Sequence, residues 1–418
     1  MQRHVIIGNG IAGASAAETI RSLDPEALIT FIAREQQLPY SRPMISQVLA
    51  AAADFSQLPL RPPDYYERMR AEALLGHEAV AIDWQGRMVQ TDRGRCVPYD
   101  RLLIASGADP RLLGVDGAGA RGVFTMRTAD DVRRIIAHLD GTSQALVLGG
   151  GLVGFKAAYG LLRRGMKVTM LIRSAHPLAM QVDADAGRII QTELERHGLS
   201  VQVGIEVTAV ESNQHQRMVR AVLSDGQILE CQLIVVGKGV RPSVAFLGND
   251  RVQVDSGIVV DDHLQTAVEG VYAAGDVAEH FDLARGQRWM NAIWPVAVEM
   301  GRIAGMNMAG RSVSFRGSLS RNVIRIFEVD VLTAGLVNPP PDPAYQVLAE
   351  RNSRLGTYRK LVFKDELLVG AALVGRVEQG GILMNTIAAR VPVVKNRERL
   401  LEPGFNYGTL APCRKAGW

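Results

Sequence analysis

The sequence has few cysteines. Its 418 residues include three, Cys96, Cys231 and Cys413, and no two of them form a C-x-x-C or C-x4-C pair. This spacing excludes a local zinc or iron–sulfur cluster and a redox disulfide between sequence neighbours, and it is typical of a reducing compartment. Cys96 and Cys231 each stand beside a strand pattern, so we expect both thiols to be buried and inert.

Long apolar runs are also missing. No run reaches the roughly 18 residues that a membrane span needs. The first strand pattern, Val5–Ile7, begins almost at Met1, which leaves no room for a signal peptide in front of it. We therefore expect a cytoplasmic protein without a membrane span.

The net charge is small, +4, and no long run of Lys or Arg occurs. Binding of a nucleic acid would need a denser basic stripe and a recognisable module, and neither is present. The positive excess lies in residues 390–418, which contain six Lys or Arg and two Asp or Glu. A basic terminal segment favours an acidic partner.

Glycine, by contrast, is abundant, with 42 residues in 418. An apolar strand leads into Gly8-x-Gly10-x-x-Gly13, and a helix of small residues then runs to about Leu23 before a strand at Leu28–Ala33. This strand–glycine–helix–strand order is the context that a dinucleotide-binding loop requires.

A second copy begins about 140 residues later. The strand from Ala145 leads into Gly149-x-Gly151-x-x-Gly154, a helix to about Arg164 and a strand at Lys167–Ile172. One isolated glycine motif would be weak evidence, but two copies in complete βαβ units predict two dinucleotide sites and an α/β fold.

Each glycine has a physical task. The first allows a tight turn, the second lets backbone approach a pyrophosphate, and the third lets helix and strand pack closely. The helix N-terminus then offers free N–H groups and partial positive charge to the phosphates.

The residue after the second strand of each unit normally meets the ribose. In the first unit Ala33 fills the expected position, and Glu35 is the candidate. In the second unit Ile172 fills it, Arg173 follows, and no carboxylate is near in the sequence. An arginine there favours the 2′-phosphate of NADPH, whereas a third glycine at Gly154 favours NADH, so the choice stays open.

The remainder of the chain is rich in short strands. Hairpins are expected at Ala79–Asp83 with Met88–Thr91, and around Asp225-Gly226. From about Arg316 strands alternate with a helix, which predicts a third, α+β domain. Its expected elements are strands at Val323–Phe327, Val331–Ala334, Lys360–Phe363 and Leu367–Ala372 and a helix near Gly381–Arg390.

Two more strands end in small-residue turns, Tyr99–Pro110 with Gly107 and Val268–Glu279 with Gly275-Asp276. The order of glycine motif, Tyr-Asp-x-Leu-Leu-Ile-Ala-Ser-Gly, second glycine motif, Val-Arg-Pro and Ala-Ala-Gly-Asp resembles the flavoproteins of the pyridine nucleotide–disulfide oxidoreductase superfamily. The stretch Leu38–Ser46 is similar to one branch: rubredoxin and flavorubredoxin reductases, the flavin part of nitrite reductases, and FAD/NAD oxidoreductases that serve ferredoxin-like partners.

The resemblance covers essentially the whole chain, most specifically residues 1–310. It implies two Rossmann-like dinucleotide-binding domains and a C-terminal α+β domain. The FAD domain would comprise residues 1–110 and 245–315, with the NAD(P) domain inserted at 111–244. Residues 316–418 would form an interface domain with a tail, in a homodimer or a larger complex.

The resemblance also implies binding residues for both cofactors. FAD would be held by Gly8, Asn9, Gly10, Gly13, Glu35, Arg42, Pro43, Val80, Gly107, Gly275, Asp276 and Trp294. Within this set Glu35 would meet the adenosine ribose, backbone at Val80 the adenine, and Asp276 the ribityl chain. The helix that begins at Trp294 would point its N-terminus at the flavin pyrimidine edge. NAD(P) would be held by Gly149, Gly151, Gly154, Arg173 and Gly239.

The sequence departs from the superfamily at three places. Relatives that reduce disulfides or peroxides carry cysteine near residues 41–46, where this chain has Ser41 and Ser46. Those activities are therefore disfavoured. Many relatives have Glu at the position of Lys156, and several have Lys at the position of Gln47, so no catalytic acid–base residue is carried over. No metal site is expected.

The function predicted is electron transfer between NAD(P)H and an acidic one-electron carrier protein, rubredoxin- or ferredoxin-like, through hydride transfer to flavin N5. Arg390, Lys395, Arg397 and Arg399 would form part of the docking face. The alternatives are an NAD(P)H oxidase that uses O2, an FAD/NAD subunit of a metalloenzyme complex, and a flavin-holding sensor. The direction of electron flow stays open.

Overall fold

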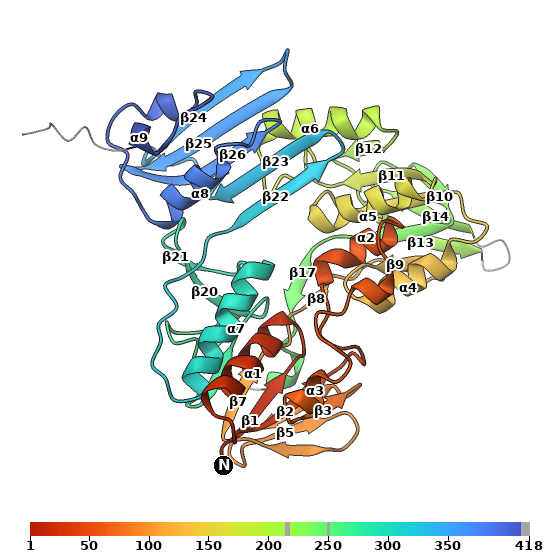
Figure 1. Ribbon diagram of the computed structural model, residues 1–418. Helices are drawn as coiled ribbons and strands as arrows, with labels where there is room; N and C mark the ends of the chain where they lie inside the picture. The colour runs from red at the N-terminus through yellow and green to blue at the C-terminus, as the bar shows by residue number, and fades with distance from the viewer. Residues whose placement is uncertain (214–217, 249–250, 411–418) are drawn as a thin grey trace, which may run out of the picture.

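The computed structural model describes residues 1–213, 218–248 and 251–410, which form three packed units (Figure 1). The first unit contains a five-stranded parallel sheet in the order β19-β7-β1-β2-β3. Its strands are β19 (Val271–Ala273), β7 (Arg101–Ile104), β1 (Arg3–Ile7), β2 (Leu28–Ala33) and β3 (Ala71–Leu75). The strands are almost wholly apolar because helices and loops cover both faces of the sheet.

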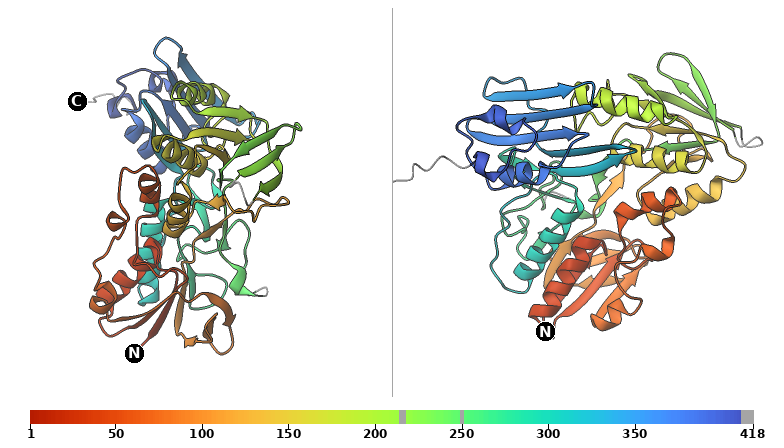
Figure 2. Two further views of the ribbon diagram at one scale, coloured as in Figure 1. Left: turned by 90° about the vertical axis from the view of Figure 1, so that its right-hand side faces the viewer. Right: turned by 45° about the horizontal axis from the view of Figure 1, so that its top comes forward.

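Two helices from opposite ends of this unit's sequence pack side by side, α1 (Ile11–Leu23) and α7 (Trp294–Met308), as both views show (Figures 1 and 2). Glycine makes this close packing possible. A Cβ at Gly305 would lie 2.6 Å from the carbonyl oxygen of Ala16, and one at Gly301 would overlap that of Ala12. Residues 294–308 are therefore part of the first unit although the second unit intervenes in the sequence.

Smaller elements surround this sheet. They are the short helices α2 (Ile45–Leu49) and α3 (Tyr65–Arg68), the sheet β4 (Ala79–Asp83), β5 (Met88–Thr91) and β6 (Cys96–Pro98), and the sheet β18 (Ile258–Val259), β20 (Ala278–Asp282) and β21 (Gln287–Trp289). The predicted hairpin of β4 and β5 is confirmed.

The prediction that the Cys96 thiol is buried is wrong, because its side chain is exposed. It begins an edge strand in which only the middle residue is buried.

The second unit repeats the plan with a parallel sheet in the order β12-β11-β10-β16-β9. Its strands are β12 (Ser200–Val203), β11 (Lys167–Ile172), β10 (Gln144–Leu148), β16 (Leu233–Val236) and β9 (Val123–Thr125). Its helices are α4 (Ala129–His138), α5 (Leu152–Arg163) and α6 (Ala184–Arg196). An antiparallel sheet, β13 (Val207–Asn213), β14 (Met218–Leu223) and β15 (Ile228–Cys231), contains the second predicted hairpin. Strands β8 (Ala108–Pro110) and β17 (Val240–Pro242) pair where the chain passes between the units.

The third unit is a five-stranded antiparallel sheet in the order β22-β23-β26-β25-β24. Its elements are β22 (Arg321–Ile326), β23 (Val329–Gly335), β24 (Tyr345–Asn352), β25 (Thr357–Lys364), β26 (Leu367–Val374), α8 (Gly380–Ala388) and α9 (Tyr407–Leu410). The expected strands and helix are present. Strand β24 was not predicted, because it is an edge strand whose side chains are mostly exposed and carry no apolar alternation. Residue Cys413 lies outside the described residues.

The third unit packs on α6 of the second unit through an ion pair between a buried lysine and a half-buried aspartate. Asp183 caps α6 by accepting from the Ala186 amide at 3.2 Å. The same carboxylate accepts from the Tyr358 hydroxyl at 2.6 Å and pairs with the Lys360 ammonium at 2.9 Å. Lys360 is 7% exposed. One aspartate thus stabilises both the start of a helix and the contact between two units.

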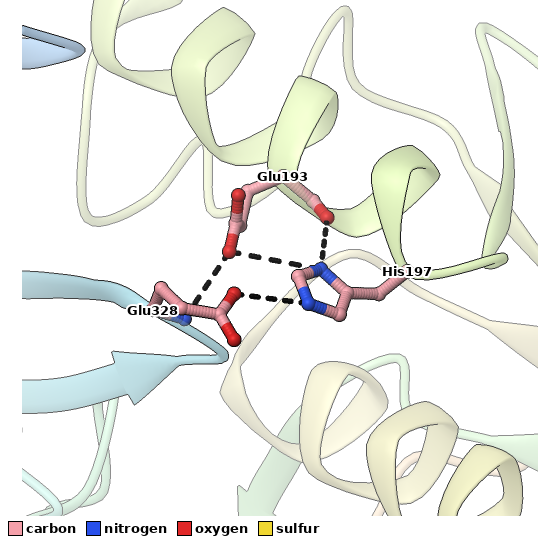
Figure 3. A group of neighbouring side chains, drawn as sticks. All are labelled: Glu193, His197 and Glu328. Carbon is pink, nitrogen blue, oxygen red and sulfur yellow. Dashed lines mark hydrogen bonds and ion pairs between the residues drawn. The ribbon is translucent and has the colours of Figure 1, made fainter.

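A second polar contact joins the same two units near the other end of α6 (Figure 3). His197 Nε2 lies 2.9 Å from the Glu328 carboxylate, and its Nδ1 lies 3.0 Å from the Glu193 carbonyl oxygen. The Glu328 amide donates to the buried Glu193 carboxylate at 3.1 Å, and the imidazole stacks on Phe327. Both ring nitrogens therefore face acceptors, one on each of the two units.

Two buried histidines make stability sensitive to acid. His4 and His280 are 0% and 2% exposed, and burial lowers the pKa of each to about 4. The unfolded chain, with histidine pKa values near 6.5, binds more protons between about pH 6.5 and 4, so stability falls as the pH falls through that window. At pH 5 each histidine lowers the free energy of unfolding by about 2 kcal/mol relative to neutral pH.

His4 offers the test because neither of its ring nitrogens has a partner among the described residues. We expect His4→Leu to raise the free energy of unfolding at pH 7 by about 1 kcal/mol, the cost of an unsatisfied buried polar group. The variant should also lose less stability than the natural chain between pH 7 and pH 5. Urea unfolding at both pH values measures this, and equal losses in the two proteins would contradict it.

Within the described ranges, no helix has both the length and the apolar character needed to cross a bilayer.

Candidate cofactor site

A cavity of about 290 Å³ lies where the carboxyl ends of the first unit's strands meet. Its wall is formed by the ends of β1 and β2, by the turns after β7 and β19, and by the start of α7. Ligands of open α/β sheets bind outside the carboxyl ends of the strands. The predicted FAD residues that line it are Gly8, Asn9, Gly10, Glu35, Arg42, Pro43, Gly107, Gly275, Asp276 and Trp294.

The glycines of the first loop divide into two groups. Gly8 has φ +106°, and a Cβ there would overlap the Ala105 carbonyl oxygen. A Cβ at Gly13 would overlap the carbonyl oxygen of Gly8, although Gly13 itself does not line the cavity. A Cβ at Gly10 would meet no protein atom within 4 Å. No described protein atom requires glycine at this position, whereas a pyrophosphate approaching the start of α1 would.

The second loop shows the same division. Gly149 has φ +117° and packs against Gly237, and Gly154 packs against Gly149, whereas a Cβ at Gly151 would meet nothing within 4 Å. These glycines lie outside the 290 Å³ cavity. From α5, which they open, only Val153 and Lys156 reach its wall.

The prediction that no carboxylate lies near Arg173 in the second unit is wrong, because folding brings one close to it. Glu206, from the turn before β13, lies 3.8 Å from the Arg173 guanidinium and 3.4 Å from the Lys238 ammonium. Arg173 has 83% of its side chain exposed. Gly239 follows Lys238 and has φ +91°. Two cations and one carboxylate thus stand together at the end of this sheet.

Glu35 lines the cavity, but its carboxylate is already engaged. The Tyr40 hydroxyl donates to one oxygen at 2.6 Å, and Arg42 forms an ion pair with the other. Burial raises the pKa of Tyr40, which keeps its hydroxyl a neutral donor. Glu35 therefore holds the Arg42 side chain in place through this ion pair. Arg34, whose guanidinium lies 2.7 Å from Asp109, lines the cavity one residue earlier and was not predicted.

Asp276 also has a partner that the sequence did not reveal. The Arg127 guanidinium lies 2.9 Å from one Asp276 oxygen and donates to the Ala108 carbonyl at 2.9 Å. Each side chain of the pair is 21% exposed. The pair joins the segment before α4 to the turn after β19, and it leaves the other Asp276 oxygen for a ligand hydroxyl.

Val80 lies next to the cavity wall. His77, Glu78 and Ala79 form this part of the wall, whereas Val80 is 49% exposed and does not line the cavity. The predicted contact of its backbone with the adenine stays a prediction. Trp294, in contrast, lines the cavity as the first residue of α7. The helix N-terminus presents partial positive charge there, which stabilises an electron-rich ligand.

The sequence matches two described families. Residues 2–301 match the pyridine nucleotide-disulphide oxidoreductase family, and residues 321–391 match the rubredoxin NAD+ reductase C-terminal domain.

Individual proteins agree with these matches. Nitrite reductase [NAD(P)H] of Bacillus subtilis is 30% identical over 96% of this chain and 49% of its own length. NADH-rubredoxin oxidoreductase of Clostridium acetobutylicum is 25% identical over 92% of this chain and 93% of its own. A solved putidaredoxin reductase–putidaredoxin complex superposes with a TM-score of 0.85, at 25% identity and 94% coverage of both chains.

The chain spans about half the length of the first two curated relatives that it matches. The family match, however, covers well over half of this chain, and it coincides with the two glycine-loop units and their shared cavity. The chain therefore belongs to the pyridine nucleotide-disulphide oxidoreductase family.

Proposed function

We propose that the protein is an FAD-dependent oxidoreductase that passes electrons between NAD(P)H and a one-electron carrier of the rubredoxin or ferredoxin type. The observation that carries this proposal is the shared cavity, where the wall of the first glycine-loop unit is completed by Val153 and Lys156 of the second. Such a wall can hold one ring system against another. No cysteine stands among the described residues of this wall, so the electrons need an acceptor outside the chain.

The residues of the cavity fit FAD, the family's cofactor. The start of α1 at Gly10 would hold the pyrophosphate, Asp276 a ribityl hydroxyl, and the start of α7 the pyrimidine edge. Bound FAD accepts a hydride and can release electrons singly, while the protein positions the reactants and tunes the electrostatics. On this proposal residues 1–110 and 245–315 form the FAD domain, 111–244 the NAD(P) domain and 316–418 the C-terminal domain.

The nucleotide would lie on the second loop, Gly149 to Gly154. Arg173 and Lys238 suit a 2′-phosphate, whereas Glu206 suits the free ribose hydroxyls of NADH. Because the site contains both kinds of group, both nucleotides belong in the test.

A carrier protein as the partner is supported by the relatives. One is named an NADH-rubredoxin oxidoreductase, and another was solved in complex with putidaredoxin. The predicted basic docking face remains part of the proposal. Arg390, Lys395 and Arg399 are exposed, and Arg390 also donates to the Leu283 carbonyl. Arg397 is half-buried and donates to the Val393 and Asp365 carbonyls, so we assign the docking role to the three exposed residues.

A second candidate is the FAD/NAD subunit of a larger, metal-containing complex. It is favoured by the nitrite reductase match, because this chain corresponds to only 49% of that enzyme. On this alternative the acceptor is a permanent partner, and it should copurify with the chain.

Anaerobic titration tests the proposal. We expect NADH or NADPH to bleach the flavin band at about one equivalent per FAD, since a hydride carries two electrons. Oxidised rubredoxin or ferredoxin should then restore the band. Recovery only on admitting air would indicate an oxidase. No bleaching by either nucleotide would contradict the enzymatic proposal for the isolated chain.

A further inference from the structure

Lys156 is a cation of the cavity wall that has no ion-pair partner among the described residues. The three arginines of the same wall each have a carboxylate partner: Arg34 pairs with Asp109, Arg42 with Glu35 and Arg127 with Asp276. In the part of the chain that the structure describes, the Lys156 ammonium has neither a hydrogen bond nor an ion pair. Its side chain is half-buried, and burial lowers the pKa of the amine below the usual lysine range.

The position of Lys156 on α5 determines which way its side chain points. Gly160, one turn further along α5, packs against α2: a Cβ there would lie 2.8 Å from Leu49 Cγ. Residues four apart share a helix face, so Lys156 also faces α2, whose first residues Ile45 and Ser46 line the cavity. Lys156 therefore stands between the second glycine loop and the cavity of the first unit.

A dinucleotide held by the second loop must pass this position to reach the cavity. Its pyrophosphate would lie at the start of α5, near Gly151. Among the residues of α5, Val153 and Lys156 are the two that form cavity wall, so the nicotinamide end of the nucleotide would meet them. That end changes charge in the reaction, because loss of a hydride converts the neutral reduced ring into a cation.

We propose that Lys156 selects the redox state of the bound nucleotide. Its ammonium repels the oxidised nicotinamide cation and leaves the neutral reduced ring unaffected, so it speeds release of NAD(P)+ and limits inhibition by that product. This inference rests on the proposed function, since it requires a nicotinamide nucleotide in the shared cavity.

The test compares affinities for the two forms under conditions in which no hydride can move. The oxidised holoprotein is titrated with NAD+ and NADP+, and the photoreduced holoprotein with NADH and NADPH. The variants are Lys156→Met and Lys156→Arg. Lys167→Met is the matched control, because Lys167 is exposed at the opposite end of β11 and outside the cavity wall.

We expect Lys156→Met to bind the oxidised nucleotide about tenfold more tightly, the scale of one removed charge repulsion at close range. Its affinity for the reduced nucleotide should change less than about twofold on the same argument, because the reduced ring has no charge to repel. Lys156→Arg and Lys167→Met should behave like the natural chain. Retention of FAD by each variant shows that the site is intact, and Lys156→Gln replaces Met if FAD is lost.

Two results would overturn the inference. Equal weakening of both forms would mean that Lys156 binds a group common to them, such as the pyrophosphate. No change in the affinity for either form would mean that Lys156 has no part in nucleotide binding. Failure of the proposed function would look different: the natural flavin would stay oxidised with NADH and NADPH, whatever the variants bind.

Discussion

The Gly10→Ala protein is expected to fold normally and to lose its flavin. Gly10 has φ −67° and ψ −177°, a conformation open to alanine, and the added methyl group would meet no protein atom within 4 Å. Such a change leaves the flavin-free fold as stable or slightly more stable. The methyl group would instead stand where the proposed pyrophosphate would approach the backbone. Loss of one or two charge-assisted hydrogen bonds weakens binding by about 10²- to 10³-fold.

Gly151→Ala is the matched variant in the second unit. Gly151 has φ −82° and ψ −178°, and its Cβ would also meet nothing. This protein should retain FAD and resist bleaching by NAD(P)H. Visible absorbance per protein and urea unfolding of the flavin-free forms measure both effects. Full flavin in Gly10→Ala would exclude the proposed pyrophosphate position. Gly13→Ala should destabilise even the flavin-free fold, because its Cβ would overlap the Gly8 carbonyl oxygen.

The Asp183→Ala protein should lose about 3 kcal/mol of stability. The substitution removes the N-cap of α6 and leaves the ammonium of Lys360, which is 7% exposed, without its carboxylate. Leaving a buried charge unpaired costs about 3–5 kcal/mol, and a lost N-cap adds about 1 kcal/mol; the 23% exposure of the Asp183 side chain reduces the total. The loss should appear as a lower urea midpoint.

A double-mutant cycle separates the cap from the ion pair. Asp183→Ala combined with Lys360→Met removes both charges, so it should be more stable than Asp183→Ala alone by about 1–2 kcal/mol. Asp183→Ser, which preserves a capping oxygen, should recover the N-cap part only. If the double variant is no more stable than the single one, the pair does not hold the third unit on the second.

The parts of the fold and site that depend on neighbouring residues were predictable from the sequence. Both glycine loops carry their turn, helix and strand within about thirty residues, so each βαβ unit was readable from local pattern. The hairpin of β4 and β5 and the strands β25 and β26 were predicted for the same reason. Strand β26 is a short continuous apolar run and β25 contains one, Leu361–Phe363, and such runs are local signals of a buried strand.

The parts that depend on distant pairings were not predictable. Arg127 meets Asp276, and Glu206 meets Arg173, only because the folded sheets bring them together. Glu35 lines the cavity as the sequence predicted, but the contacts of its carboxylate with Arg42 and Tyr40 appear only once the turn after β2 folds. In these cases the residue type indicated a role in the site, but the sequence did not show which side chain the residue would contact, because such contacts are set by tertiary packing.

The split sheet of the first unit also bears on how the protein is made. Strand β7 ends at Ile104, but its neighbour β19 begins only at Val271, and α7, which packs on α1, follows later still. A ribosome adding 5–20 residues per second needs about 10–30 s to synthesise the roughly 170 residues between these strands. The nascent chain can therefore complete its second unit before its first. On the proposed site, flavin binding must wait until α7 has been synthesised, and a transcript truncated within the second unit would encode a protein that cannot retain flavin.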